Sequence, residues 1–206
     1  MKKASKKFIV LNEVDSTNNY AKQLLLSKAD EATVVLARFQ NAGKGQQGKY
    51  WESESGKNML ASIILYPYFL PAAKQFLISK VVSLGLVDFL KTKVKNVAVK
   101  WPNDIYVGNK KIAGILIENT ISGSNLQSAI VGIGVNLNQE NFVSDAPNPV
   151  SLKQITGLEY NAEILADEVL QSILQWYEKL KIDDFKAIDS AYISTLFRMN
   201  EWAKYK

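Results

Sequence analysis

The chain has 206 residues, of which 47% are hydrophobic, enough for one globular domain with a substantial core. It contains neither cysteine nor histidine, which excludes disulfides, thiolate metal sites and catalysis by imidazole, including a Ser-His-Asp triad. The formal net charge of +5 favours a phosphate-bearing ligand or an acidic partner. No basic stripe with interleaved aromatic residues accompanies that charge, so we expect no nucleic-acid partner.

The first seven residues are basic and lead into only a short apolar run. We therefore expect neither a secretory signal nor a membrane-spanning segment, and we place the protein in the cytoplasm. The first strand is predicted over residues 8–11, and too little chain precedes it for a helix-turn-helix module. A helix follows, with Asp15 or Ser16 as its N-cap.

Hydrophobic periodicity predicts the remaining elements. A long central helix is expected over 72–94, two amphipathic helices over 161–181 and 183–196, and loops over 41–56 and 139–150. Further strands are predicted over 33–37, 58–66, 97–99, 105–107, 112–117 and 129–137. Strands come mostly first and helices last, which favours one α+β domain over 1–206, with a sheet backed by helices.

A glycine-rich loop begins after the strand at 33–37, and three interpretations of it are open. Gly43 to Lys49 has the spacing of a phosphate-binding loop, G-x-x-x-x-G-K, but Tyr50 replaces the magnesium-binding Ser or Thr, and turn-like residues follow instead of a helix. The loop can also be an ordinary polar surface loop. Alternatively, its glycines let backbone N–H groups approach an anion while Lys44 and Lys49 supply positive charge.

A second motif, residues 100–104, reads Lys-Trp-Pro-Asn-Asp at a strand end. A strand followed by a common turn accounts for Pro102, Asn103 and Asp104, but does not require the Lys and Trp before them. Residues 16–18, Ser-Thr-Asn, are likewise explained by an ordinary helix cap when they are taken alone.

Taken together, several segments closely resemble the biotin protein ligase family. They are residues 15–18, 40–48 with Trp51, 100–105, 111–118 and 132–138. The resemblance implies the fold of class II aminoacyl-tRNA synthetases and biotin ligases, a mixed, mostly antiparallel sheet backed by helices. It also implies a ligase that uses ATP and Mg²⁺ to form biotinoyl-AMP from biotin, and then biotinylates a lysine of a biotin carboxyl carrier protein of acetyl-CoA carboxylase. A homodimer is compatible with the resemblance.

The family match also implies roles for individual residues. Lys111 is the expected catalytic residue, Asp104 the expected magnesium ligand, and the expected ATP-binding residues are Lys44, Gln46, Lys49, Asn103 and Asn136. The expected biotin-binding residues are Ser16, Thr17, Asn18, Gln40, Gly43, Lys44, Gly45, Gln46, Trp51, Lys111 and Gly114. If the segment is a regular strand, Lys110 and Lys111 point to opposite faces, and Lys111 shares a face with Ala113 and Ile115.

The chain departs from the family pattern in two places. Lysines and glutamine stand at loop positions where family members commonly carry arginine, so point charges and an amide replace bidentate guanidinium groups. The sequence ends where family members continue into an SH3-like barrel, so we expect that domain to be missing or truncated. The alternatives are a lipoate-type ligase of the same fold, which lacks support from the motifs, and a non-catalytic sensor of biotin or its adenylate.

Overall fold

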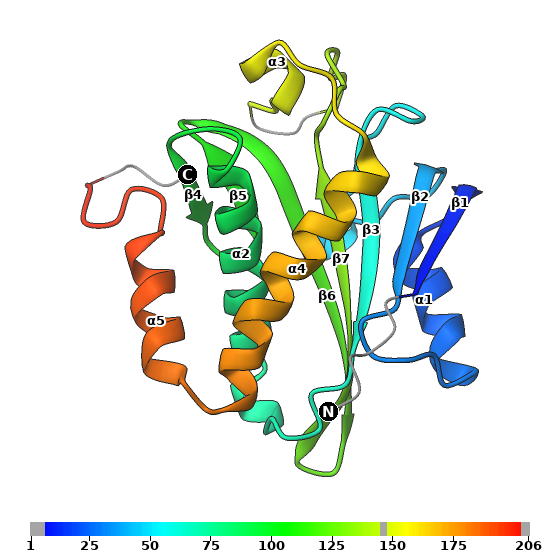
Figure 1. Cartoon of the computed structure of the whole chain (residues 1–206), viewed down its shortest axis with the longest axis vertical. Helices are drawn as coiled ribbons and strands as arrows, with labels where there is room; N and C mark the ends of the chain where they lie inside the picture. Colours follow the sequence, from blue (N-terminus) through cyan, green and yellow to red (C-terminus); the bar gives the residue numbers. More distant parts are fainter. Residues whose placement is uncertain (1–6, 145–147, 203–206) are drawn as a thin grey trace.

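The computed structural model describes residues 7–144 and 148–202, which form one seven-stranded sheet with helices on both faces (Figure 1). The strand order is β1-β2-β3-β7-β6-β5-β4. Only β1 and β2 pair in parallel; every other neighbouring pair is antiparallel, which confirms the predicted mixed sheet. The strands are β1 (Phe8–Val14), β2 (Val34–Gln40), β3 (Met59–Leu65), β4 (Val97–Lys100), β5 (Asp104–Val107), β6 (Lys110–Ser122) and β7 (Asn125–Val135).

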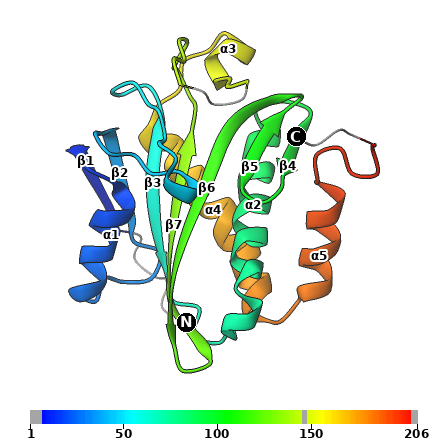
Figure 2. The same ribbon diagram turned by 180° about the vertical axis from the view of Figure 1, so that it is seen from behind.

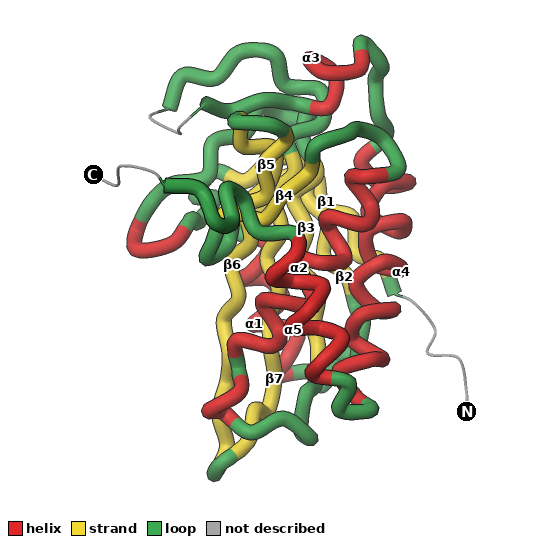
Figure 3. Tube along the Cα trace, turned by 90° about the vertical axis from the view of Figure 1, so that its left-hand side faces the viewer, coloured by secondary structure: helices red, strands yellow, loops and turns green. Residues whose placement is uncertain are grey.

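Three helices, α2 (Phe76–Lys91), α4 (Ala162–Lys181) and α5 (Phe185–Ser194), share the main core with one face of the sheet (Figure 1). The helix α1 (Thr17–Leu26) packs on the opposite face, where it closes a smaller apolar cluster (Figure 2). Figure 3 shows the sheet edge-on, with α4 and α1 on its two sides. The helix α1 thus covers only part of this face of the sheet.

Successive side chains of the central strands point alternately to these two faces of the sheet. On β7, Ile133 and Val135 belong to the core under the long helices, whereas Gly132 and Gly134 lie on the opposite side, near Asn18 and Trp51. The absence of side chains at these two glycines leaves room for groups from other segments directly on the sheet.

Most predicted elements are present, but several differ in extent, including β1 and β2, which each end three residues later than predicted. The predicted helix over 72–94 is a short 3-10 turn followed by α2, and β6 and β7 form a hairpin that extends well beyond the predicted strands. The short helix α3 (Leu152–Thr156) was not predicted, although its signals are in the sequence. Ser151 and Gln154 form a reciprocal capping box, and Gly157 ends the helix in the left-handed conformation.

None of the helices within 7–144 and 148–202 combines the length and the apolar character needed to cross a bilayer.

Candidate active site

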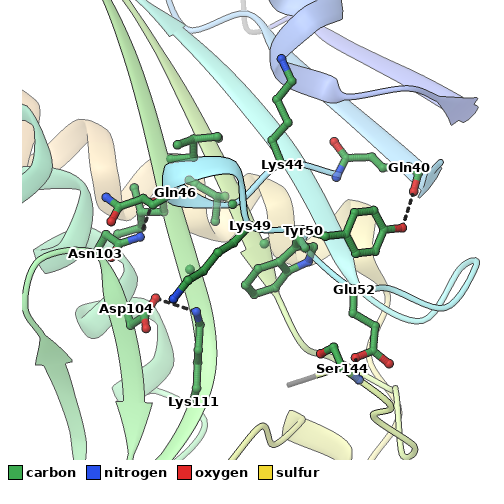
Figure 4. A pocket seen from close by; sticks show the side chains of 18 of the residues that line it. Gln40, Lys44, Gln46, Lys49, Tyr50, Glu52, Asn103, Asp104, Lys111 and Ser144 are labelled. Atoms are coloured by element: carbon green, nitrogen blue, oxygen red, sulfur yellow. Dashed lines mark hydrogen bonds and ion pairs between the residues drawn. The ribbon is translucent and has the colours of Figure 1, made fainter. Parts of the chain in front are cut away.

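A cavity of about 740 Å³ opens on the α1 side of the sheet (Figure 4). Its walls come from the start of α1, the glycine-rich loop, strands β5, β6 and β7, and the segment that follows β7. Of the residues predicted to act in the site, those that line it are Ser16, Thr17, Asn18, Gln40, Lys44, Gly45, Gln46, Lys49, Trp51, Asn103, Asp104, Lys111, Gly114 and Asn136. The sequence segments that carry the resemblance thus meet at one place, although their individual roles remain predictions.

A buried hydrogen-bond network holds the start of α1 against the sheet. Gln40 Oε1 accepts from the Thr17 backbone N–H at 2.7 Å and from the Thr17 hydroxyl at 3.0 Å. Asn18 Nδ2 donates to Glu118 at 2.7 Å, and Asn18 Oδ1 lies 2.6 Å from the Ser62 hydroxyl. The polar groups of Thr17 and Asn18 therefore already have protein partners.

Ser16 stands at the cap position of α1, as predicted, but its side chain makes no capping hydrogen bond. Ser16 is 2% exposed and lines the cavity. Its backbone carbonyl instead accepts from the N–H of Tyr20. The Ser16 hydroxyl therefore does not serve as a helix cap.

The glycine-rich loop has a defined path that excludes the phosphate-loop interpretation. A bridge joins Lys44 to Tyr50, and a 3-10 turn over Gln46–Gly48 lies between them. The next element after this turn is strand β3, so no α-helix starts at Lys49 and the loop lacks the helix N-terminus that such a motif requires. Lys44 Nζ donates to Asn19 Oδ1 at 2.6 Å and so points toward α1, as Figure 4 shows, rather than into the middle of the cavity.

Trp51 lies flat on a floor made by two glycines from adjacent strands. A Cβ atom at Gly114 would stand 2.7 Å from the indole, and one at Gly134 would stand 2.3 Å from it. Gly43 does not line the cavity but permits the loop to turn, because a Cβ there would lie 2.8 Å from the Trp51 carbonyl oxygen. These three glycines are thus needed for Trp51 to reach its position.

The cavity contains an ion pair between Lys111 Nζ and Asp104 Oδ1, 2.7 Å apart (Figure 4). Both side chains are 19% exposed, and the Lys111 ammonium lies 5.5 Å from the centre of the Trp51 ring. Lys110, next to it in the chain, is exposed and does not line the cavity. The structure therefore places Lys111, and not Lys110, in the site.

The predicted face of Lys111 was wrong. The register between β5 and β6 shifts so that Tyr106 pairs with Lys111 and Ile105 with Ala113. Ile112, between Lys111 and Ala113, is therefore an extra residue in β6, and it interrupts the regular alternation of side chains along the strand. Lys111 consequently lies on the cavity side with Gly114, whereas Ala113 and Ile115 belong to the core under the long helices.

Asn103 and Asn136 both line the cavity, and each is fixed by a hydrogen bond to the backbone. Asn103 Nδ2 donates to the carbonyl oxygen of Ile115 at 3.0 Å, and Asn136 Nδ2 donates to that of Val150 at 3.1 Å. Asn136 is 4% exposed. Each amide therefore keeps its carbonyl oxygen in a fixed position.

The donor set suits a magnesium ion that arrives with a nucleotide. Within the described ranges there is no group of three or more acidic side chains that could hold a metal without help from a ligand. Mg²⁺ commonly binds through one or two carboxylates together with substrate phosphates. Asp104 and Glu52 are the acidic side chains along the cavity. Both Glu52 oxygens accept from backbone N–H groups, whereas the ion pair with Lys111 uses one Asp104 oxygen, so Asp104 is the candidate ligand.

Several lining residues were not singled out from the sequence. Glu52 and Ser144 give no signal, because their contact joins segments about ninety positions apart. Gly132 and Gly134 lie within residues 132–138, one of the segments that carry the resemblance, and their spacing of two was the signal that they share a strand face. Tyr50 is also present, with its hydroxyl 3.5 Å from the carbonyl oxygen of Gln40.

Comparisons with known proteins agree with this geometry. Residues 10–136 match the model of the biotin/lipoate A/B protein ligase family. The chain is 34% identical over 201 residues to the biotin–[acetyl-CoA-carboxylase] ligase of Paracoccus denitrificans, covering 93% of this chain and 82% of that protein. It is also 34% identical over 172 residues to the bifunctional ligase/repressor BirA of Bacillus subtilis, covering 81% of this chain but only 51% of that protein.

Among solved structures, a biotin protein ligase from Aquifex aeolicus in complex with biotin and ATP superposes with a TM-score of 0.80. The identity is 28%, and the match covers 93% of this chain and 78% of that one. The chain therefore belongs to the biotin/lipoate A/B protein ligase family. Within it, the fold and the sequence group the chain with the catalytic domain of biotin protein ligases, and it spans about half the length of the Bacillus relative.

Proposed function

We propose that the chain activates biotin with ATP and transfers it to a lysine of a biotin carboxyl carrier protein, such as that of acetyl-CoA carboxylase. The observation that carries the proposal is the cavity in which the Lys111–Asp104 pair lies beside the Trp51-covered glycine floor. The similarity to a ligase described in complex with biotin and ATP supports it.

In the first step, a biotin carboxylate oxygen attacks the α-phosphorus of ATP, the bond to the β-phosphate oxygen breaks, and pyrophosphate leaves. The reactants are both anions and repel each other. Lys111 brings a fixed ammonium group between them in a partly buried site, where such a charge acts more strongly than in water. Lys111 therefore stabilises the charge that develops during adenylation.

In the second step, the neutral amine of the carrier lysine attacks the acyl carbon of biotinoyl-AMP. The carbon–oxygen bond to the phosphate breaks, AMP leaves, and the new amide nitrogen loses a proton. A carboxylate is a poor acyl donor because it would have to expel an oxide, whereas AMP leaves as a stabilised anion. Adenylation thus makes amide formation feasible.

Further lining residues divide between the two ligands. Ser16 and Gln40 supply short polar groups suited to the ureido ring of biotin, while Asn103, Asn136 and Lys49 serve the nucleotide. When bound with ATP, Mg²⁺ neutralises phosphate charge, and Asp104 is the side chain that would hold it.

Exchange of labelled pyrophosphate into ATP tests the first step. We expect exchange with biotin and Mg²⁺, and none with lipoate or without an acid. Exchange with lipoate alone would identify a lipoate-type ligase. Biotin binding without exchange would identify a sensor and contradict the proposal.

A further inference from the structure

Glu52, directly after Trp51, connects the glycine-rich loop to the segment over residues 139–144 (Figure 4). One carboxylate oxygen accepts from the Val143 N–H at 2.8 Å, and the other accepts from the Ser144 N–H, also at 2.8 Å. Burial acts to raise the pKa of Glu52, but hydrogen bonds from Ser144, Val143 and Gln139 outweigh it and lower the pKa below the ordinary value. Glu52 is therefore held as a carboxylate by groups of the 139–144 segment.

The two ends of this segment are fastened differently. At its start, Gln139 is fully buried and its Oε1 accepts from Asn58 Nδ2 at 2.5 Å and from the Glu54 N–H at 3.1 Å. At its end, the Val143 side chain is 90% exposed. Within the described residues, the backbone N–H groups of Val143 and Ser144 both donate to Glu52. Glu52 therefore holds the backbone of residues 143 and 144 against the glycine-rich loop.

This contact matters to the cavity because Phe142, Val143 and Ser144 form part of its wall. The segment continues from Asn136 at the end of β7, on the side of the cavity that we have placed next to the nucleotide. Glu52 also follows the residue that covers the glycine floor, so its contacts fix two walls relative to each other. A shift of either wall changes the space open to the nucleotide.

We propose that Glu52 is a positioning residue that holds the 139–144 segment against the glycine-rich loop and thereby sets the affinity for ATP. This inference rests on the proposed adenylation. Glu52 acts on the nucleotide through Phe142 and its neighbours and takes no part in the chemistry.

The Glu52→Gln variant separates this role from simple packing, because it keeps the shape of the side chain. Each carboxylate oxygen accepts one backbone N–H, so an amide group places its NH₂ against a second donor and loses that hydrogen bond. Glu54→Gln is the matched control: it removes the same charge two residues away, from an exposed side chain. Glu52→Asp keeps the carboxylate but shortens its reach.

We expect the amide protons of Val143 and Ser144 to exchange with solvent about tenfold faster in ligand-free Glu52→Gln, as measured by NMR. The reason is that the variant loses one hydrogen bond to this backbone, and a change of about tenfold is what the loss of one such bond produces. In pyrophosphate exchange, the KM for ATP should rise about tenfold while kcat changes less than about threefold. Glu54→Gln should match the wild type, and Glu52→Asp should be intermediate.

The inference would be overturned if the Val143 and Ser144 amide protons of Glu52→Gln exchanged with solvent at the wild-type rate. It would also be overturned if Glu54→Gln showed the same rise in the KM for ATP as Glu52→Gln. A fall in kcat alone would also overturn it, since that assigns Glu52 to the chemical step. The amide measurement needs no ligand. If the wild type fails to exchange pyrophosphate with biotin, the proposed function fails, while the positioning of the segment by Glu52 is still tested.

Discussion

Replacing Lys111 by Gln removes an ammonium group that is ion-paired with Asp104 inside the cavity. The pair distance is 2.7 Å and both side chains are only 19% exposed, so water compensates poorly for the lost charge. Loss of one preorganised charge at a reacting centre costs about 3 kcal/mol, or on the order of a hundredfold in rate. We therefore expect Lys111→Gln to lose at least that factor in biotin-dependent pyrophosphate exchange.

The neighbouring lysine provides the control. Lys110→Gln removes the same charge from an exposed side chain outside the cavity, so its exchange rate should stay within about twofold of the wild type. Urea unfolding of both variants checks that the fold is intact. Equal rates in the two variants, or a defect confined to Lys110→Gln, would refute the assignment of Lys111 to the reaction.

Three further predictions concern other parts of the site. Asp104→Ala should abolish magnesium-dependent adenylation yet leave calorimetric affinity for biotin alone within about threefold, because its role is on the nucleotide side; a large loss of biotin affinity would contradict that role. Biotin with ATP should slow proteolysis within residues 41–55, because the glycines and charges of this loop gain an anionic partner; unchanged cleavage would contradict the binding of an anion by this loop. Gly134→Ala should displace Trp51, whose indole would lie 2.3 Å from the added Cβ, and weaken biotin binding about tenfold or more in calorimetry; unchanged affinity would contradict the glycine floor.

The sequence predicted the strands and helices well where periodicity was long and regular. The helices α2 and α4 carry apolar side chains on one face over four turns or more; α4 matches its predicted bounds within one residue, and α2 lies within its predicted range but is shorter. The candidate site was predicted from short motifs. Chain order alone could not bring residues 16, 40, 104 and 136 together, but a resemblance that specifies a fold could.

Besides the helix α3, two features of the site escaped prediction for physical reasons. The shift of register between β5 and β6 depends on pairing across the sheet, and nothing local marks the extra residue, so the face of Lys111 was assigned wrongly. The contact of Glu52 with Val143 and Ser144 uses backbone N–H groups, which every residue except proline carries. Side-chain patterns therefore could not reveal it.

Intact-mass measurement of a biotin carboxyl carrier domain tests most directly whether the chain is a complete ligase. The carrier is incubated with the chain, biotin, ATP and Mg²⁺, beside a carrier whose acceptor lysine is replaced by arginine. We predict a single biotinoyl group on the unaltered carrier and none on the arginine variant. An unmodified carrier, or equal labelling of both, would contradict a specific biotin ligase.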